Sequence, residues 1–363
     1  MTDKIYGLVG CGMMGIEHVQ NVNLLPGAQI GVVYDPLPDN AAKAASIAGA
    51  ATIAKSFEDL ISNETLDAVI LVSPNQVHVD QLEAIATKRT VPILCEKPLF
   101  TEPAHRARIE TLRRDYVAPI WVAMEYRYMP PIATLIRDAC VITGGVEMLS
   151  IKEHRFPFLK KFGNWNRFNR NTGGTFVEKC CHFFDLMRLI LDSEAVRVMA
   201  SASQVTNHRE EQYGGEVPDI WDSGYVIVEF ETGARAMLEL CMFADGSRWN
   251  EEISAVGEKG KIECRLPGPQ RFWPEEDIGP PPAPQLSIAP RHPKNPQTRD
   301  IPITPELAMA GDHHGSTFYQ HQRFLEVVRG NAAPEVTLED GMRAVDIGLA
   351  AQEAALAHRV VHL

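Results

Sequence analysis

The sequence predicts an α/β N-terminal Rossmann domain with a doubly wound parallel sheet, followed by an α+β C-terminal domain with a large, mostly antiparallel open sheet. Three observations lead to this fold class. Strand-like and helix-like segments alternate over the first third of the chain, a glycine-rich turn follows the first strand, and longer strand-like runs begin near Val146. At 363 residues the chain can form two cores. We place the domains at residues 1–125 and 126–363, with the C-terminal helices able to pack back on the first domain.

The first domain is expected to have short strands rich in β-branched residues at 5–9, 29–34, 68–72, 93–95 and 120–124. Helical stretches lie between them at 14–24, 40–47, 57–61, 79–88 and 104–114. This alternation implies a parallel sheet with both faces covered, and right-handed crossovers then make it doubly wound.

The second domain is expected to have strands at 146–153, 196–205, 224–231, 234–243 and 253–265, the last broken at Gly257. A helix over 176–191 is their main companion, and helices return at 317–329 and 338–357. The proline-rich stretch 267–305 is predicted to be a long surface excursion, because proline cannot donate to a β-ladder.

Composition excludes several classes of protein. A formal charge of −12 speaks against a nucleic-acid binder, and no run reaches the roughly 18 apolar residues of a membrane span. The chain enters a strand almost at once, which leaves no signal segment. Seven scattered cysteines without a C-x-x-C pair suit a reducing cytoplasm and give no zinc pattern, and His313-His314 has no ligand-spaced neighbours. We therefore expect a cytoplasmic protein without a metal.

The glycine loop G-C-G-M-M-G stands between the first strand and the first helix, the context that a dinucleotide site requires. Gly10 permits the tight turn, Gly12 lets a pyrophosphate approach the backbone, and Gly15 brings helix and strand together. Met13 and Met14 begin the helix, whose N-terminus attracts phosphate. A glycine turn can also be purely structural.

Asp35 favours the dinucleotide interpretation, because it ends the second strand twenty residues after Gly15. Its carboxylate can accept hydrogen bonds from both ribose hydroxyls of NAD and would repel the 2′-phosphate of NADP. No Arg or Lys follows it closely, since the next residues are Pro36-Leu37-Pro38. NAD is therefore the predicted cofactor.

Two further segments end strands at the carboxyl edge of the sheet, where ligands of doubly wound folds bind. Ser73-Pro74-Asn75 is followed by His78, which either contacts the cofactor or caps a helix. Glu96-Lys97-Pro98 follows the strand at 93–95, and the proline pushes Lys97 out of helical geometry. Such a lysine can polarise a reacting oxygen; the alternative is a surface lysine at a strand end.

The expected helix over 176–191 carries Glu178, His182 and Asp185 on one face, because they are spaced four and three residues apart. The rest of the helix is densely apolar, so a buried polar stripe would need partners or a ligand. Histidine suits general-base chemistry because its ordinary pKa is near neutral pH. The alternative is the solvated face of an amphipathic helix.

A basic, aromatic loop precedes this helix, with the sequences H-R-F-P-F-L-K-K at 154–161 and W-N-R-F-N-R at 165–170. Aromatic rings pack on the C–H faces of a pyranose, while Arg and Asn bind hydroxyls or an anionic group. The loop is predicted to form one wall of a sugar site, with a charged subunit interface as the alternative.

These segments occur in the same order and at the same distances in one large enzyme group. The chain resembles the Gfo/Idh/MocA family of NAD(P)-dependent oxidoreductases, named for glucose–fructose oxidoreductase and inositol dehydrogenase. The resemblance covers essentially the whole chain, including Y-R-Y-M-P at 126–130. It implies that Lys97 contacts substrate and cofactor and that His182 is the general base. Glu178 replaces the family's aspartate and Cys180 its small residue.

The resemblance adds one more segment to the predicted site. In this family a residue that closes the substrate pocket often lies where this chain has Asp312, His313 and His314. The predicted catalytic residues are Lys97, His182 and Glu178. The predicted cofactor-binding residues are Gly10, Gly12, Met13, Met14, Gly15, Asp35, Ser73, Pro74, Asn75, His78, Glu96, Lys97 and Arg127. The predicted substrate-binding residues are Lys97, Arg155, Trp165, Asn166, Arg167, Glu178, His182 and His314.

The implied activity is NAD-dependent oxidation of a secondary hydroxyl of a sugar, sugar derivative or cyclic polyol. The alternative enzyme is a redox-neutral NAD-dependent glycoside hydrolase, for which an anionic sugar glycoside is a candidate substrate. An NAD-binding regulatory protein without chemistry is a third reading, which the presence of Lys97 and His182 opposes. By the same resemblance we expect a homo-oligomer formed through the sheet of the second domain, with neither nucleic acid nor membrane as partner.

Overall fold

The computed structural model describes residues 3–49 and 51–363. The chain divides into two compact units, Met1–Glu125 with Glu306–Arg343 and Tyr126–Pro305 with Ala344–Leu363. The segment 306–343 therefore belongs to the first unit, whereas the sequence-based division left it with the second domain and allowed its helices to pack on the first. Each unit is described by itself.

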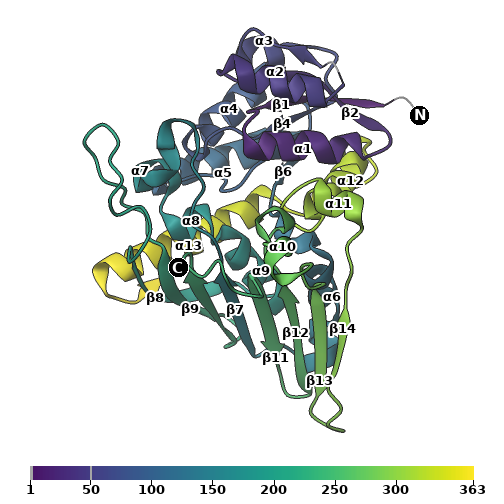
Figure 1. Ribbon diagram of the computed structural model, residues 1–363. Helices are drawn as coiled ribbons and strands as arrows, with labels where there is room; N and C mark the ends of the chain where they lie inside the picture. The colour runs from purple at the N-terminus through teal and green to yellow at the C-terminus, as the bar shows by residue number, and fades with distance from the viewer. Residues whose placement is uncertain (1–2, 50) are drawn as a thin grey trace. The chain divides into compact units, whose positions relative to one another are not determined.

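The first unit contains a six-stranded parallel sheet in the order β3-β2-β1-β4-β5-β6, which confirms the predicted doubly wound fold (Figure 1). Its strands are β1 Lys4–Val9, β2 Ala28–Tyr34, β3 Thr52–Ile53, β4 Ala68–Leu71, β5 Ile93–Cys95 and β6 Ile120–Val122. Every residue of β4, β5 and β6 is buried, as expected for strands covered on both faces. Sequence reasoning missed β3, because two exposed residues carry no hydrophobic pattern.

Helices of the first unit connect these strands and bring a late segment back to the sheet. They are α1 Met13–Asn23, α2 Pro38–Ile47, α3 Phe57–Ile61, α4 His78–Lys88, α5 Arg106–Asp115, α11 Pro305–Met309, α12 Ser316–Val328 and the start of α13 Leu338–Ala357. Helix α12 packs beside α1 (Figure 1). Phe324 of α12 lies edge-on to Tyr6 and Trp121 in the core, so the late segment completes the N-terminal core.

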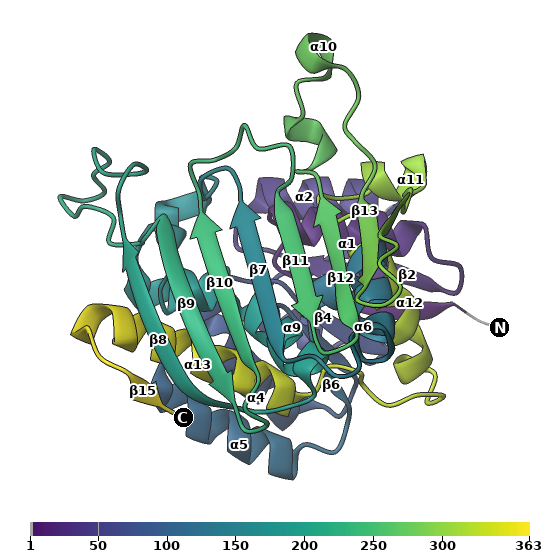
Figure 2. The same ribbon diagram turned by 90° about the horizontal axis from the view of Figure 1, so that it is seen from below.

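The second unit contains a nine-stranded sheet in the order β14-β13-β12-β11-β7-β10-β9-β8-β15 (Figure 2). Among the described strands of this second sheet, only β7 and β10 pair in parallel. The strands are β7 Met148–His154, β8 Ala195–Ser203, β9 Ser223–Phe230, β10 Arg235–Cys241, β11 Glu251–Val256, β12 Gly260–Leu266, β13 Gln285–Pro290, β14 Gln297–Asp300 and β15 Val361–His362. The large, mostly antiparallel sheet confirms the predicted fold class.

One face of this sheet packs on helices and the other is bare. Helices α6 Pro130–Thr143 and α9 Cys181–Leu191 lie behind the sheet in Figure 2, whose near face carries no helix of this unit. Residues of β9 and β10 alternate between buried and more exposed, and Tyr225, Ile227 and Met237 lie on the bare face. This alternation is typical of an antiparallel sheet with one packed face.

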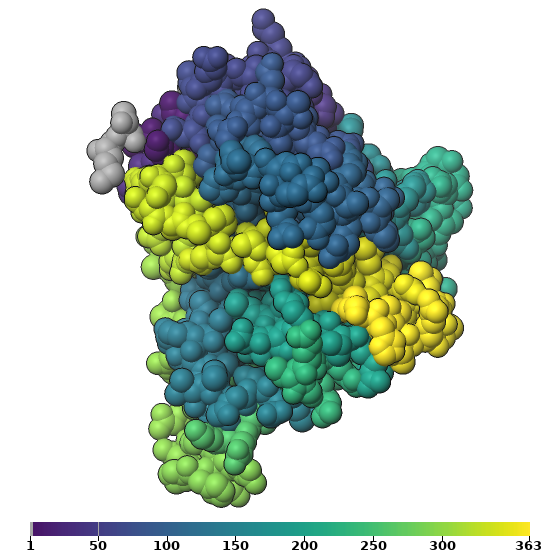
Figure 3. All heavy atoms as spheres, turned by 180° about the vertical axis from the view of Figure 1, so that it is seen from behind, coloured from purple at the N-terminus to yellow at the C-terminus, as the bar shows by residue number. Residues whose placement is uncertain are grey.

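Two predictions for the second unit were wrong. The proline-rich stretch 267–305 contains β13 and β14, because its prolines gather before β13, at its last residue and in the turn that follows. That turn lies beyond the ends of β13 and β14 (Figure 1), and its atoms form a projection on the surface in Figure 3. The expected continuous helix over 176–191 is broken into α8 Thr175–Glu178 and α9, with a turn at Lys179 and Cys180.

Candidate active site

The glycine loop before α1 contains three glycines, and each position has a different physical reason for lacking a side chain. A side chain at Gly10, whose φ is +91°, would place Cβ 2.5 Å from the carbonyl oxygen of Val72. At Gly15 the same atom would lie 2.2 Å from the carbonyl oxygen of Gly10. At Gly12 no described atom from beyond the adjoining residues lies within 4 Å of that position. Gly10 and Gly15 are thus required by the fold, while Gly12 leaves open space at the N-terminus of α1, where an anion is stabilised.

Asp35 follows β2 directly and is held against the glycine loop. Its Oδ2 accepts a hydrogen bond from the Cys11 N–H at 2.7 Å, and its Oδ1 accepts one from the Leu37 N–H at 2.8 Å. A carboxylate oxygen has more than one acceptor position, so both oxygens can also accept from ribose hydroxyls. The open space at Gly12 and the oriented Asp35 carboxylate fit a dinucleotide without a 2′-phosphate.

His78 begins α4 and is fully buried. Its Nδ1 lies 2.9 Å from the carbonyl oxygen of Pro98, and its Nε2 lies 2.9 Å from that of Ser73. The imidazole therefore joins the segment after β4 to the segment after β5. The structure places Ser73, Pro74 and Asn75 at the carboxyl end of the parallel sheet, as expected, and their contact with a cofactor stays a prediction.

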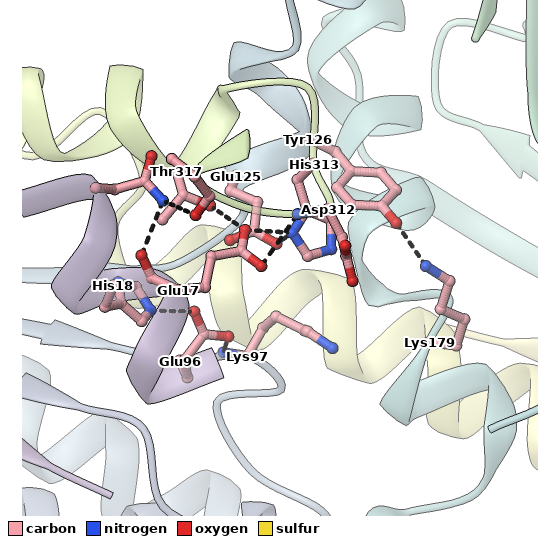
Figure 4. A network of polar contacts seen from close by, with 12 residues as sticks. Glu17, His18, Glu96, Lys97, Glu125, Tyr126, Lys179, Asp312, His313 and Thr317 are labelled. Carbon is pink, nitrogen blue, oxygen red and sulfur yellow. Dashed lines mark hydrogen bonds and ion pairs between the residues drawn. The ribbon is translucent and has the colours of Figure 1, made fainter. Parts of the chain in front are cut away.

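Glu96 fixes the backbone beside Lys97 through a buried chain of side chains (Figure 4). Its Oε1 lies 2.9 Å from His18 Nε2, and its Oε2 accepts from the Lys97 N–H at 3.2 Å. His18 Nδ1 in turn lies 2.8 Å from Nε2 of His321 on α12. Burial raises the pKa of Glu96, but the hydrogen bond and charge of His18, together with the charges of Lys97 and His78, hold that pKa below its usual value. Lys97 itself is half-buried, and the Lys97–Pro98 bond is cis.

A second buried group joins α1 to the segment before α12 (Figure 4). Oε1 of Glu17 accepts from Thr317 Oγ1 at 2.9 Å and lies 2.8 Å from His313 Nδ1. His313 Nδ1 is also 3.7 Å from Oε1 of Glu125. Burial raises the pKa of Glu125 to about 7 against the opposing effect of His313. His313 therefore pairs with carboxylates of its own unit; the neighbouring His314 is half-buried with a φ of +53°.

In the second unit, the Gly173-Gly174 pair sets the position of α8. Both residues have positive φ, +77° and +92°. The φ of Gly174 favours glycine, and a Cβ there would lie 1.9 Å from Nε2 of Gln352, so that side chain would also have to move. Glu178 ends α8 and is buried, as is His182 in the first turn of α9.

Two residues of the predicted polar stripe, Asp185 and His182, have different partners. Asp185 forms a bidentate ion pair with Arg127, with oxygen–nitrogen distances of 2.6 and 2.5 Å, and both side chains are buried. This ion pair is internal to the second unit; the cofactor contact predicted for Arg127 stays a prediction. The imidazole of His182 stacks on the ring of Tyr126, with centroids 4.1 Å apart and planes 6° apart.

The basic, aromatic loop is braced largely by its own contacts. Asn166 Nδ2 donates to the Leu159 carbonyl at 2.9 Å, and the buried Arg167 Nε donates to Glu211 at 2.9 Å. The half-buried Trp165 lies under Lys161, whose Nζ is 4.7 Å from the ring centroid. Asn166 and Arg167 therefore support the loop, and their contact with a substrate stays a prediction.

A buried charge cluster behind Tyr126 was not anticipated from the sequence. Lys179 Nζ lies 2.5 Å from the Tyr126 hydroxyl and 2.9 Å from Oε1 of Glu153, which Arg155 also contacts at 3.3 Å. Burial raises the pKa of the neighbouring Glu251 to about 7. The available signal was a lysine inside an apolar segment. Likewise, Glu17 and His18 are two adjacent ionisable residues inside the helix that follows the glycine loop.

Comparison with known proteins identifies the family. Residues 4–123 match the model described as the NAD-binding Rossmann fold of the oxidoreductase family, and residues 142–363 match its C-terminal alpha/beta domain. The chain belongs to the Gfo/Idh/MocA oxidoreductase family. The predicted family, enzyme class and cofactor, NAD, are confirmed; the open space at Gly12 and the carboxylate of Asp35 are the features that would hold it.

Relatives in this family are similar over most of their length. The chain is 25% identical to the uncharacterized oxidoreductase YrbE of Bacillus subtilis, over 72% of this chain and 73% of that protein. It is 22% identical to myo-inositol 2-dehydrogenase of Thermotoga maritima, over 98% of each. The structure of levoglucosan dehydrogenase in complex with NADH matches with a TM-score of 0.81 at 18% identity, covering 99% of both chains, which shows a common fold.

No helix in the part of the chain that the structure describes is long and apolar enough to cross a membrane. Within residues 3–49 and 51–363, no group of three or more His, Cys, Asp or Glu side chains could hold a metal ion.

Proposed function

We propose that the protein is an NAD-dependent dehydrogenase that oxidises a secondary hydroxyl of a sugar, a sugar derivative or a cyclic polyol. Membership of the oxidoreductase family supports the reaction type. The names of two relatives, a myo-inositol 2-dehydrogenase and a levoglucosan dehydrogenase, support this substrate class.

The observation that carries the proposal is the brace on Lys97. A surface lysine at a strand end needs no support, yet the residue before Lys97 is buried and anchored through His18 to His321. Such anchoring restricts the backbone from which the ammonium group extends, and a fixed cation is what a developing alkoxide requires.

The remaining roles follow from the chemistry of each side chain. NAD, when bound, supplies the hydride acceptor. The N-terminus of α1 holds its pyrophosphate and Asp35 its ribose hydroxyls. His182 takes the hydroxyl proton, Lys97 stabilises the negative charge that develops on the oxygen, and Glu178 orients the substrate ring.

A screen of inositols, sugars and glycosides with NAD and NADP tests the proposal. Absorbance of reduced nicotinamide and release of aglycone are followed in parallel. We expect reduced nicotinamide to accumulate with NAD on at least one polyol or sugar. Release of aglycone without net reduction would instead indicate the redox-neutral glycoside hydrolase. Lys97→Ala and His182→Ala should abolish turnover and preserve NAD binding; unchanged turnover would remove these residues from the mechanism.

We also infer that the protein forms a homo-oligomer through the bare face of the nine-stranded sheet. Tyr225, Ile227 and Met237 are exposed there, beside the Arg197–Glu229 ion pair. Burying these apolar side chains against a second copy would be favourable. Light scattering after size exclusion should show an oligomer that Ile227→Glu dissociates; a monomeric wild type would contradict the inference.

A further inference from the structure

The cluster behind Tyr126 contains a lysine that the fold by itself does not require. The Lys179 side chain is 6% exposed, and its carboxylate partner Glu153 is fully buried. Removing an ammonium group from water costs several kcal/mol, and replacing a buried ion pair by apolar residues is often neutral or stabilising. The location of Lys179 is therefore better explained by what its ammonium group contacts.

Two contacts, both through Tyr126, connect that ammonium group to the imidazole of His182. The Nζ atom donates to the Tyr126 hydroxyl at 2.5 Å and lies 4.8 Å from the centroid of the same ring. The opposite partner, Oε1 of Glu153, is 2.9 Å away, so the ammonium is held between a phenol and a carboxylate. The Tyr126 ring then lies parallel to His182, while Phe183 packs against the edge of that ring.

Lys179 is held between a turn and the sheet of the second unit. Lys179 is in the turn that separates Glu178 from α9, and its side chain runs into the unit toward Tyr126 (Figure 4). The carboxylate that anchors it belongs to β7, whose register places Glu153 opposite Glu251 of β11. A side chain fixed at both the turn and the sheet has little rotamer freedom left, so it can transmit a fixed position to the phenol.

We propose that Lys179 is a positioning residue for His182, which it acts on through the hydroxyl of Tyr126. The hydrogen bond holds the hydroxyl oxygen in place, and with it the tilt of the ring on which the imidazole stacks. Without it, the hydroxyl end of the Tyr126 ring can shift, and the imidazole can leave the orientation in which it accepts the hydroxyl proton. The catalytic consequence rests on the proposed dehydrogenase activity, whereas the effect on the ring geometry does not.

The test compares Tyr126→Phe, Lys179→Met and the double variant. Tyr126→Phe keeps the ring and leaves the Lys179–Glu153 pair in place, so it removes only the hydrogen bond to Lys179. If Lys179→Met fails to fold, Tyr126→Phe alone still tests the proposal. Loss of one charge-assisted hydrogen bond should lower kcat about tenfold in each single variant. Because both substitutions remove the same Lys179–Tyr126 hydrogen bond, the double variant should be no slower than Lys179→Met. Lys179→Arg, which keeps a charged donor, should recover part of the rate.

A measurement that needs no substrate separates this proposal from the proposed function. A stacked tyrosine shields the ring protons of His182, so their NMR signals should lie upfield of those of an unstacked histidine. The signals are assigned as those that disappear in His182→Gln. Tyr126→Phe and Lys179→Met should shift and broaden these signals. Lys4→Met removes a lysine–aspartate pair of 2.8 Å in the first unit and should change neither the signals nor kcat.

The outcomes are distinct. Unshifted His182 signals in both Tyr126→Phe and Lys179→Met, or multiplicative losses of kcat in the double variant, would overturn the proposal. A lowered melting temperature with kcat per folded molecule unchanged would also overturn it, because Lys179 would then be structural only. If the wild type oxidises no alcohol, the proposed function fails, and the NMR signals still decide whether Lys179 positions the ring.

Discussion

Replacing Glu125 by Gln should stabilise the first unit increasingly as pH rises. Glu125 is fully buried, and burial, with the nearby negative charges of Glu96 and Glu17, raises its pKa from 4.5 to about 7 against the opposing effect of His313. Below pH 4.5 the carboxyl is protonated in both the folded and the unfolded chain, so its environment carries no electrostatic penalty. Between pH 4.5 and 7 the unfolded chain releases the proton first, so stability falls as pH rises.

The magnitude follows from the same shift. A rise from 4.5 to about 7 corresponds to about 3 kcal/mol at roughly 1.4 kcal/mol for each pH unit. Glutamine has nearly the same shape and stays neutral, so Glu125→Gln avoids this loss. Its advantage over wild type should be less than about 1 kcal/mol at pH 5 and about 3 kcal/mol at pH 8.

Glu17 provides the control with the opposite sign. Burial raises its pKa too, but the charge and hydrogen bond of His313, with bonds from Thr317 and the Asp312 N–H, outweigh burial and lower that pKa. Its ionised form is therefore favoured in the folded state, and this stability is present above the usual carboxyl pKa and lost as pH falls through the lowered value. Glu17→Gln should be less stable than wild type at pH 8, and the difference should shrink on acidification.

Urea unfolding of both variants between pH 5 and 8 measures these slopes. Tryptophan fluorescence follows the transition, since Trp121 is fully buried in the core of the same unit. The reasoning is refuted if the Glu125→Gln advantage does not change with pH, or if the two variants show slopes of the same sign.

Three further predictions test the cofactor loop and the buried ion pair. Gly12→Val should weaken NAD binding at least tenfold with little change in melting temperature, since its Cβ meets no described atom from beyond the adjoining residues within 4 Å. Gly15→Val should instead unfold the loop, and calorimetric NAD titration with thermal melts distinguishes the two variants. Asp35→Ser should reduce the preference for NAD over NADP, measured as the ratio of the two dissociation constants. Arg127→Met should cost about 3–5 kcal/mol in urea unfolding because it leaves Asp185 buried without its cation, and Arg127→Met with Asp185→Leu should recover much of that loss.

The fold was predictable because its signals are local. The strands of the parallel sheet are continuous apolar runs, and the helices between them begin and end close to the expected residues. The second sheet was less accessible. Strand β13 carries only one fully buried residue, Leu286, and β14 none, so their pairing with β12 is decided by the ladder and not by a hydrophobic pattern. The proline content suggested a loop, whereas a strand of this sheet needs only a short proline-poor segment in which to pair with its neighbour.

The candidate site was predictable only where a motif implies a backbone geometry. Gly10 and Gly15 have a steric reason that the spacing reveals. His18 and Glu96 are far apart in sequence, and nothing in either local pattern shows that they meet at 2.9 Å. Their partner His321 belongs to a helix that returns from the far end of the chain. Contacts of this kind depend on topology, which propensity and periodicity do not specify.

The break between α8 and α9 shows why the second part of the site could not be derived by helical periodicity. On one continuous helix, Glu178 and His182 would share a face and Lys179 would lie about 100° from it. In the structure Glu178, Lys179 and His182 are all buried, and the turn lets Lys179 run inward to Glu153. An amphipathic helix with one solvated face, the alternative considered from the sequence, would leave part of this set exposed. The departure from a regular element thus coincides with the residues that carry the proposed chemistry, as expected where function outweighs local preference.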